Sequence, residues 1–466
     1  MPQNLRRKAL ITATTMSSHQ KISPKHSPED SSQDTPTAPP SDRDAFAALR
    51  FRDFRLFAIG RILIFTSFQM QTVALGWEIY DRTGSALALG GVGLAQVLPM
   101  ILLTLFAGHV ADRQDRKRTI LFAIGLLILC SLGLAMVSYR QGAIAWIYTL
   151  LVLIGMSRAF LKPASDAFIW QLIPVSVFTN AATWNSSSFQ IAAVAGPALG
   201  GLAIAALGSA TGVYLLAALA AILCFGSVLL IPIRPVTHRS EPISLKALSA
   251  GFKFVWQNQL VLAAISLDLF AVLLGGATAL LPIFAKDILQ VGPLELGYLQ
   301  AAPSIGALIM AVAIAHLPPF RRAGLAMLWS VLGFGIVTIV FGLSRWFWLS
   351  LLMLAFTGAL DMISVVIRHT LVQIRTPEHL RGRVAAVNSI FISASNELGG
   401  FESGLAAAAF GPVIAVVGGG IGTIVVVFAT LGLFPSLKNL GALEDYREKE
   451  SDSLETTELG EKESVA

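Results

Sequence analysis

Charged residues and cysteines are both scarce in this chain of 466 residues. Only 13% of the residues are charged, and Cys130 and Cys224 are its two cysteines, whereas about 25% of the residues of a typical soluble protein are charged. The scarcity of charge argues against a soluble globular protein. Two cysteines, both inside long apolar runs, exclude a framework of several disulfides and a cysteine-based metal site.

The chain also lacks the phosphate-binding pattern Gly-x-x-x-x-Gly-Lys-Ser/Thr, which excludes an ATP site of the usual kind. No group of residues suggests catalysis or metal binding, so we expect neither an enzyme nor a bound cofactor. Any activity that needs energy must therefore draw on an ion gradient, which we expect to be the proton gradient, or on the gradient of a solute.

Long apolar segments fill most of the chain. Hydrophobic residues make up 55% of it and its mean hydropathy is +0.69. A helix needs roughly 20 apolar residues to cross the hydrocarbon core of a membrane. Twelve segments meet this length: 56–78, 86–108, 119–138, 144–165, 183–206, 212–232, 259–283, 294–316, 324–343, 346–367, 386–409 and 412–434. The sequence therefore predicts an all-α membrane protein with twelve transmembrane helices.

Lysine and arginine are distributed unevenly between the predicted loops. With the N-terminus inside, the inner loops 109–118, 158–180, 233–258, 317–323 and 368–384 hold sixteen of them, and the outer loops hold four. Because loops rich in Lys and Arg stay in the cytoplasm, we expect both termini in the cytoplasm and the protein in the plasma (inner) membrane. The same bias explains the net charge of +6 without a nucleic-acid partner.

The polar stretches divide the chain into five regions. Residues 1–55, rich in Ser, Thr, Pro and charge, predict a disordered N-terminal tail, and residues 435–466 predict an acidic tail. Bundles of six helices cover 56–232 and 259–434. The connector 233–258 ends in an amphipathic pattern, with Leu248 and Val255 at helical spacing, which predicts a helix at the inner membrane face.

The two halves repeat each other at a shift of 203 residues. The matched pairs are Pro174 and Pro377, Asn185 and Asn388, Ser186 and Ser389, Gly196 and Gly399, Gly201 and Gly404, and Gly208 and Gly411. Chance matching of abundant glycines does not easily produce the Pro and Asn-Ser pairs. Repeated bundles that rock about a site between them are an architecture of transporters.

The inner loop after the second span, "GHVADRQDRKRT", carries six charges in twelve residues. It resembles the loop signature of the major facilitator superfamily, in which Gly and three residues precede Asp, a basic residue, one further residue, Gly and two basic residues. The matching residues are Gly108, Asp112, Arg113, Arg116 and Lys117, and Asp115 stands in place of the second Gly. Because Asp tolerates left-handed backbone better than most residues, we expect Asp115 to make the tight turn.

This resemblance implies a latch at the inner face. Asp112 would meet the positive start of the eleventh span, where Arg381 and Arg383 are the expected partners. The alternative is that Arg113 and its basic neighbours only enforce the topology, and both roles are compatible.

The fifth span contains "AAVAGPALGG", with Gly196, Pro197, Gly200 and Gly201. It resembles a Gly-Pro-x-x-Gly-Gly signature of exporters in the superfamily, although ordinary close packing of membrane helices also explains it. The stretches "FRDFRLF", "GWEIYDRTGSALALG" and "TPEHLRGRVAAVNS" extend the resemblance to the branch that includes the enterobactin exporters. The resemblance implies the major facilitator fold.

Ionisable residues inside the predicted spans are candidates for function because they are expensive in a membrane. We expect Asp268 and Glu397 to bind a proton or a cationic substrate, with Glu402 third; Asp361, Arg61 and Arg158 are further candidates. The alternative is that each pairs with an arginine or a helix end and only stabilises the fold. Polar residues expected to line a cavity are Gln69, Gln71, Gln96, Asn185, Gln190 and Trp184.

These observations together predict a secondary transporter that acts by alternating access. We expect it to be a monomer in the lipid bilayer that exports small organic molecules, drug-like or siderophore-like, by proton antiport. An importer or uniporter of the same fold, or a membrane sensor or scaffold that does not transport, remains an alternative.

Overall fold

The structure is a computed structural model, and it describes residues 44–113, 115–232, 245–318 and 320–441. The chain divides into two units, residues 1–44 and 45–466, and the fold is that of the second unit. Throughout the described residues this unit is built from helices and contains no strand. We use inner and outer for its two ends as the loop charges predict them.

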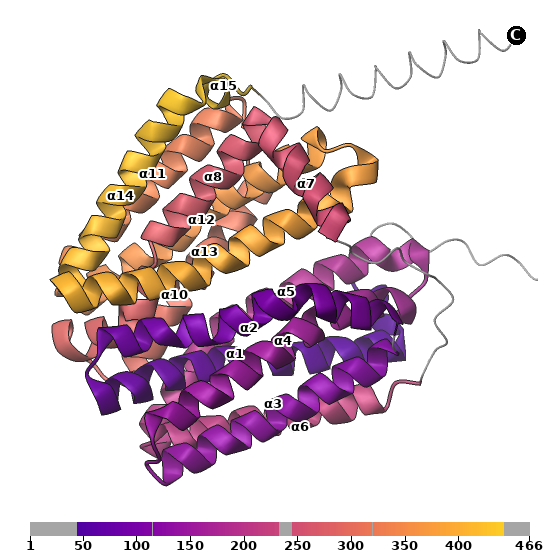
Figure 1. The fold of residues 1–466 in the computed structure, drawn as a ribbon, viewed down its shortest axis with the longest axis vertical. Coiled ribbons are helices and arrows are strands. Elements are labelled where there is room, and N and C mark those ends of the chain that lie inside the picture. The colour runs from indigo at the N-terminus through magenta and orange to yellow at the C-terminus, as the bar shows by residue number, and fades with distance from the viewer. Residues whose placement is uncertain (1–43, 114, 233–244, 319, 442–466) are drawn as a thin grey trace, which may run out of the picture. The chain divides into compact units, whose positions relative to one another are not determined.

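Each half consists of six long membrane segments (Figure 1). The first half comprises α1 (Arg52–Thr83), α2 (Ala86–Arg113), α3 (Arg116–Tyr139), α4 (Ile144–Leu172), α5 (Phe178–Leu207) and α6 (Ala210–Leu229). The second comprises the segment that begins with α8 (Gln259–Leu274), then α10 (Pro293–His316), α11 (Ala323–Leu343), α12 (Phe347–Arg375), α13 (Arg381–Phe410) and α14 (Pro412–Leu433). The predicted helix of the connector is α7 (Leu245–Gln257), and the short α15 (Pro435–Lys438) follows α14.

Eleven of the described helical segments are long and apolar enough to cross a membrane. The predicted span 386–409 lies within α13, which is a continuous helix of 30 residues and therefore about 45 Å long. It carries four charged residues, Arg381, Arg383, Glu397 and Glu402. Its length and its packing between α2 and α8 are consistent with a twelfth span.

The seventh span was predicted as one helix over 259–283, but the structure breaks it. Helix α8 ends at Leu274, and the chain continues through η3 (Ala277–Leu280), α9 (Leu281–Ile283) and the π-helical η4 (Phe284–Ile288). The break lies at Gly275 and Gly276, residues that weaken a helix, and Pro282 follows it without an amide N–H. A Cβ atom at Gly276 would lie 2.7 Å from the carbonyl oxygen of Gly399, so this position needs glycine for α13 to approach.

The predicted repeat is confirmed for the turn and the helix that carry the matched residues. Short 3₁₀ turns, η2 (Val175–Val177) and η5 (Glu378–Leu380), follow Pro174 and Pro377. Helices α5 and α13 then begin and end at positions that differ by 203 residues. Both are closed by glycines with positive φ, Gly208 at +68° and Gly411 at +89°.

The repeated helices α5 and α13 also make the most extensive contacts with the other half. Helix α5 packs along α10, and α13 packs along α2 (Figure 1). Their backbones meet through glycines: Gly201 faces Gly297, and Gly404 faces Gly90. Small residues let membrane helices approach this closely, so both crossings hold the halves together near the outer end.

Candidate functional site

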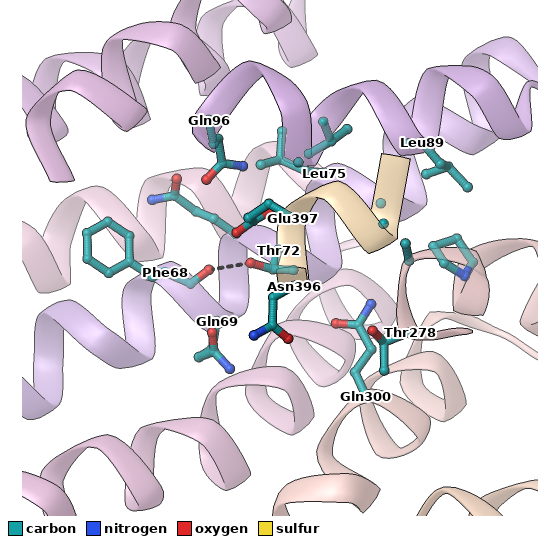
Figure 2. Close-up of a pocket in the computed structure, with 18 of the residues that line it drawn as sticks. Phe68, Gln69, Thr72, Leu75, Leu89, Gln96, Thr278, Gln300, Asn396 and Glu397 are labelled. Carbon is teal, nitrogen blue, oxygen red and sulfur yellow. Dashed lines mark hydrogen bonds between the residues drawn. The ribbon is translucent and has the colours of Figure 1, made fainter. Parts of the chain in front are cut away.

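A cavity of about 340 Å³ lies between the two halves, at the level where α1 and α2 face α10 and α13. This volume is at the lower end of the usual range for small-molecule sites. Figure 2 shows Gln69, Gln96, Gln300 and Glu397 around the same space. Its polar lining residues are Gln69, Gln71, Thr72, Gln96 and Arg158 from the first half and Thr278, Gln300, Asn396 and Glu397 from the second.

Two opposite charges face this cavity, one from each half. Arg158 on α4 donates a hydrogen bond from Nη1 to Oε1 of Gln96 at 3.0 Å, and its guanidinium lies 5.3 Å from the ring centre of Phe68. Glu397 on α13 lines the same cavity from the second half. The cavity therefore combines a cationic side chain from one half and a carboxyl group from the other.

A glycine on α2 makes room for the carboxylate of Glu397. A Cβ atom at Gly93 would lie 2.8 Å from Oε2 of Glu397 and 3.2 Å from its carbonyl oxygen. Any side chain at this position would therefore displace Glu397 or push α13 away from α2.

The amide side chains of the cavity differ in how firmly they are held. Gln71 is buried and donates from Nε2 to the hydroxyl of Ser131 at 2.9 Å. Within the described residues, neither Gln69 nor Gln300 makes a side-chain hydrogen bond, so both amides are available to a ligand. The cavity therefore offers donors and acceptors from opposite halves to one polar molecule.

The outer end of the bundle is closed by contacts between the halves. Lys286 forms an ion pair with Asp81 at 2.5 Å, and the hydroxyl of Tyr80 donates to Asp287. These contacts join the end of α1 to η4, beside the α5–α10 and α2–α13 glycine crossings. On the inner side, an open groove runs along α5, and it includes the predicted residue Gln190 and Leu308 of α10.

Asp268, predicted to bind a proton or a cation, lies away from the central cavity. It forms an ion pair with Arg368 at 2.5 Å, and the exposed fractions of the two side chains are 6% and 3%. Asp361 and Ser364 line a small cavity beside it. This arrangement matches the structural alternative for Asp268, and its role in ion binding stays a prediction.

Arg368 is the residue of this cluster that the sequence analysis missed, because it was assigned to the inner loop 368–384. The structure continues α12 to Arg375 and buries Arg368. The available signal was its spacing from Asp361: seven residues, or about two turns, place both side chains on the same helix face.

Other predicted site residues lie outside both clusters. Arg61 pairs with Asp166 at 3.3 Å and lies over the ring of Phe65. Glu402 lies further along α13 and does not line the central cavity. The Oδ1 atoms of Asn185 and its repeat partner Asn388 are buried and have no hydrogen-bond partner in the described part of the chain.

Trp184 does not line the central cavity but anchors the segment before α1. Its indole Nε1 donates to the carbonyl of Ala45 at 2.9 Å, and its ring packs against Phe46. Asn180 binds the same segment through the carbonyl of Ala45 and the amide of Ala48.

The inner loop after α2 differs from its predicted geometry. Asp115 was expected to take left-handed backbone, but it is extended, with φ −60° and ψ 114°, and caps α3 by accepting from the amides of Lys117 and Arg118. An aspartate is well suited to this N-cap role. Lys117 donates to the carbonyls of Leu229 and Ile231 at the end of α6, and Arg116 donates to that of Ala167.

The latch itself stays a prediction. Gly108, Asp112 and Arg113 belong to α2, but their side chains are outside the described residues. Arg381 pairs with Glu378 at 3.2 Å, and the carbonyl of Arg383 lies against Gly251 of α7.

The Gly-Pro motif of α5 serves close packing. Gly196 and Gly200 lie against Gln69 and Met70 of α1, and Gly201 lies against α10. Pro197, however, lines the central cavity. The motif therefore joins helix packing to the shape of the site.

Comparison with known proteins identifies the family to which this architecture corresponds. Residues 43–458 match the model of a family described as transmembrane secretion effector. Two similar proteins are the enterobactin exporters EntS of Shigella boydii serotype 18 (strain CDC 3083-94 / BS512) and Escherichia coli O81 (strain ED1a). Each is 28% identical over 381 residues, which cover 80% of this chain and 89% of the relative.

Solved structures show the same fold at low sequence identity. The nucleoside transporter NupG is 15% identical with a TM-score of 0.65, over 82% of this chain and 99% of that one. A bacterial homologue of the human lysosomal transporter Spinster, in an inward-facing and occupied conformation, is 13% identical with a TM-score of 0.64, over 83% and 96% of the chains. The major facilitator fold predicted from the sequence is confirmed.

Proposed function

Since the chain belongs to the transmembrane secretion effector family of major facilitator transporters, we propose that it exports small organic molecules by alternating access, coupled to the proton gradient. That it is a multi-pass membrane transporter follows from its spans and its relatives. The direction of transport and the coupling ion form the proposal. Export is favoured by the likeness to enterobactin exporters, and the inner membrane with both termini in the cytoplasm is the proposed location.

The central cavity is the observation that supports this function most. It lies between the repeated halves and takes polar groups from both, including the Arg158 cation and the Glu397 carboxyl. A substrate that bridges the halves binds differently in each arrangement of them, and this difference in affinity is what shifts a conformational equilibrium. No bound cofactor is needed for this work.

Because the outer end is closed, the outer contacts must open after the substrate has bound. The Asp81–Lys286 pair and the Tyr80–Asp287 hydrogen bond must break before the cavity opens outward. In the proposed cycle, substrate enters from the inner side, the halves rock, and a proton returns to the Glu397 carboxyl from outside. In this cycle Glu397 holds the proton when the substrate has left.

The residues that line the cavity indicate the chemical class of the substrate. Free amides at Gln69 and Gln300 and the pair of opposite charges suit a compact molecule with several hydroxyl, amide or zwitterionic groups. The proposed class is therefore a polar organic metabolite or drug, with siderophore-like molecules included by the named relatives.

Transport in everted membrane vesicles tests the proposal. Compounds are first selected as those to which a strain lacking the gene becomes sensitive. Each selected compound should then dissipate a preformed proton gradient in vesicles with the intact protein. Glu397→Gln should reduce this effect by about tenfold or more, a change equivalent to about 1.4 kcal/mol or more in the barrier.

Glu402→Gln is the matched control because it makes the same change five residues further along α13, outside the cavity. Equal effects of the two substitutions would contradict the role of Glu397. Substrate movement that proceeds unchanged without a proton gradient would contradict proton coupling.

A further inference from the structure

The second half contains a buried charge cluster that the central cavity does not include. Asp268 on α8 and Arg368 on α12 form an ion pair at 2.5 Å, and both side chains are almost fully buried. Asp361, also on α12, lies near both of them, and their charges act on it. Because Asp268 and Arg368 cancel each other, an ionised Asp361 leaves the cluster with one negative charge in excess.

Two polar atoms in this cluster have unused hydrogen-bonding capacity. Ser364 is 1% exposed, and its Oγ atom has no hydrogen-bond partner among the residues that the structure describes. The same is true of the Nε atom of Arg368. Buried polar groups are normally paired with protein or with a small bound species, so these atoms indicate that something is held here.

A cavity of the right size lies beside Ser364 and the two aspartates. Its volume is about 10 Å³, and Asp268, Asp361 and Ser364 all line it, together with apolar residues such as Val331 and Phe334 of α11. This volume holds about one water-sized species. The site is therefore too small for an organic molecule and large enough for a single small ion.

We propose that this cavity binds one unit of positive charge at Asp361, delivered either as a proton or as a sodium ion. A proton would convert the Asp361 carboxylate into the carboxylic acid, with no other reactant. A sodium ion would take oxygen ligands from Asp361, Asp268 and Ser364, the ligand type that hard cations prefer. Either one cancels the excess charge of the cluster.

The surroundings contain few groups that compete for this role. Asp268 from α8 and Arg368 from α12 are the charged groups that face Asp361, and His369 beside Arg368 is exposed. Helices α11 and α14, which pack on α8 and α12, carry no titratable residue. Helix α10, which packs along α12, carries Glu295 and Tyr298 in its first two turns and His316 at its last residue. Glu397 of α13 faces the central cavity instead.

This inference deepens the proposed ion coupling and rests on it for its use in transport. A site inside one half moves with that half, so the ion is bound without touching the substrate. Binding of the charge is nevertheless measurable in the purified protein at rest, whether or not the protein exports anything.

The test compares the purified full-length protein with Asp361→Asn in two arms. In the proton arm, protons taken up between about pH 8 and about pH 5 are counted in weakly buffered solution, and the variant should take up about one fewer per protein. In the sodium arm, bound radioactive sodium is measured at about pH 8, and the variant should lose it. A difference in either arm supports the inference and identifies the ion.

Two further variants keep the test decisive. Ser364→Ala should weaken sodium binding several-fold, while Ser395→Ala, an equally buried serine whose hydroxyl is already bonded to the carbonyl of Ile392, should not. If Asp361→Asn does not fold, Asp361→Glu replaces it: acidification should give an infrared band of a protonated carboxyl that shifts in this variant.

Unchanged proton uptake and unchanged sodium binding in Asp361→Asn would overturn the inference, whatever happens to export. Absence of export by the wild-type protein, when that protein still binds the charge, would count against the proposed function alone.

Discussion

Two arginine–carboxylate clusters among the described residues differ in where their members are attached. Arg158 and Glu397 belong to opposite halves and face a cavity of about 340 Å³. Asp268 and Arg368 belong to the same half and are in direct contact at 2.5 Å. We call them the bridging cluster and the internal cluster. The same residue types therefore line a shared cavity from opposite halves in one cluster and form an ion pair within a single half in the other.

The largest expected effect concerns the stability of the internal cluster. Arg368→Met would leave Asp268 and Asp361 buried without a cation, which typically costs about 3–5 kcal/mol when one partner of a buried pair is removed. The purified variant should lose its folded form at a much lower temperature than the wild type.

Two variants complete this comparison. The double variant Asp268→Asn with Arg368→Gln removes both charges and should recover most of the loss. Arg321→Met, at an exposed position, should behave like the wild type. Normal thermal stability of Arg368→Met would mean that the internal cluster does not hold the half together.

The next effect concerns transport through the bridging cluster. Gly93→Ala would place a methyl group 2.8 Å from the Glu397 carboxylate and 3.2 Å from its backbone oxygen, so α2 and α13 must shift. Export should fall by about tenfold, because small misplacements at a site cause losses of this order or more, while the amount of protein in the membrane is retained.

Gly125→Ala on α3 is the control, since a Cβ atom there has no neighbour within 4 Å. If both variants exported at the wild-type rate, the close approach of α2 to Glu397 would have no role in the site.

The smallest effect is expected at the outer contacts. Lys286 and Asp81 are 38% and 54% exposed, and such exposed pairs contribute about 0–1 kcal/mol. Lys286→Gln should therefore raise the labelling rate of a cysteine introduced by Thr278→Cys, probed from outside, by about fivefold at most.

The charge swap Asp81→Lys with Lys286→Asp should restore the slower labelling. Native Cys130 and Cys224 are buried and should give little background. A much larger increase in Lys286→Gln would show that this pair holds the outer end closed almost alone.

The sequence predicted the helices and their repeat well because both follow from local patterns. Apolar runs of sufficient length are sufficient to define membrane helices, and the shift of 203 residues correctly matched the bounds of α5 and α13 and the glycines that end them. The break after Leu274 was not predicted. The signal, Gly275-Gly276 followed by Pro282, was present in the sequence but is also compatible with a continuous membrane helix.

The site was predicted only in part because facing and pairing depend on tertiary packing. Glu397, Arg158 and three glutamines were selected as polar residues within spans, and the structure brings them to one cavity. Nothing in the local sequence distinguishes Glu397 from Asp268, whose partner Arg368 lies a hundred residues away. Asp115 was expected to turn the chain, but competition from the exposed amides of α3 made it a helix cap.

The two glycine crossings have a mechanical consequence. Gly201 with Gly297 and Gly404 with Gly90 are points where bare backbones touch, so few side chains must interlock or release when the helices slide. Two such contacts define a rotation axis near the outer end of the bundle. The displacement of an atom grows with its distance from a rotation axis. A tilt of a few degrees would therefore move the inner ends of the helices several times further than the glycine contacts themselves.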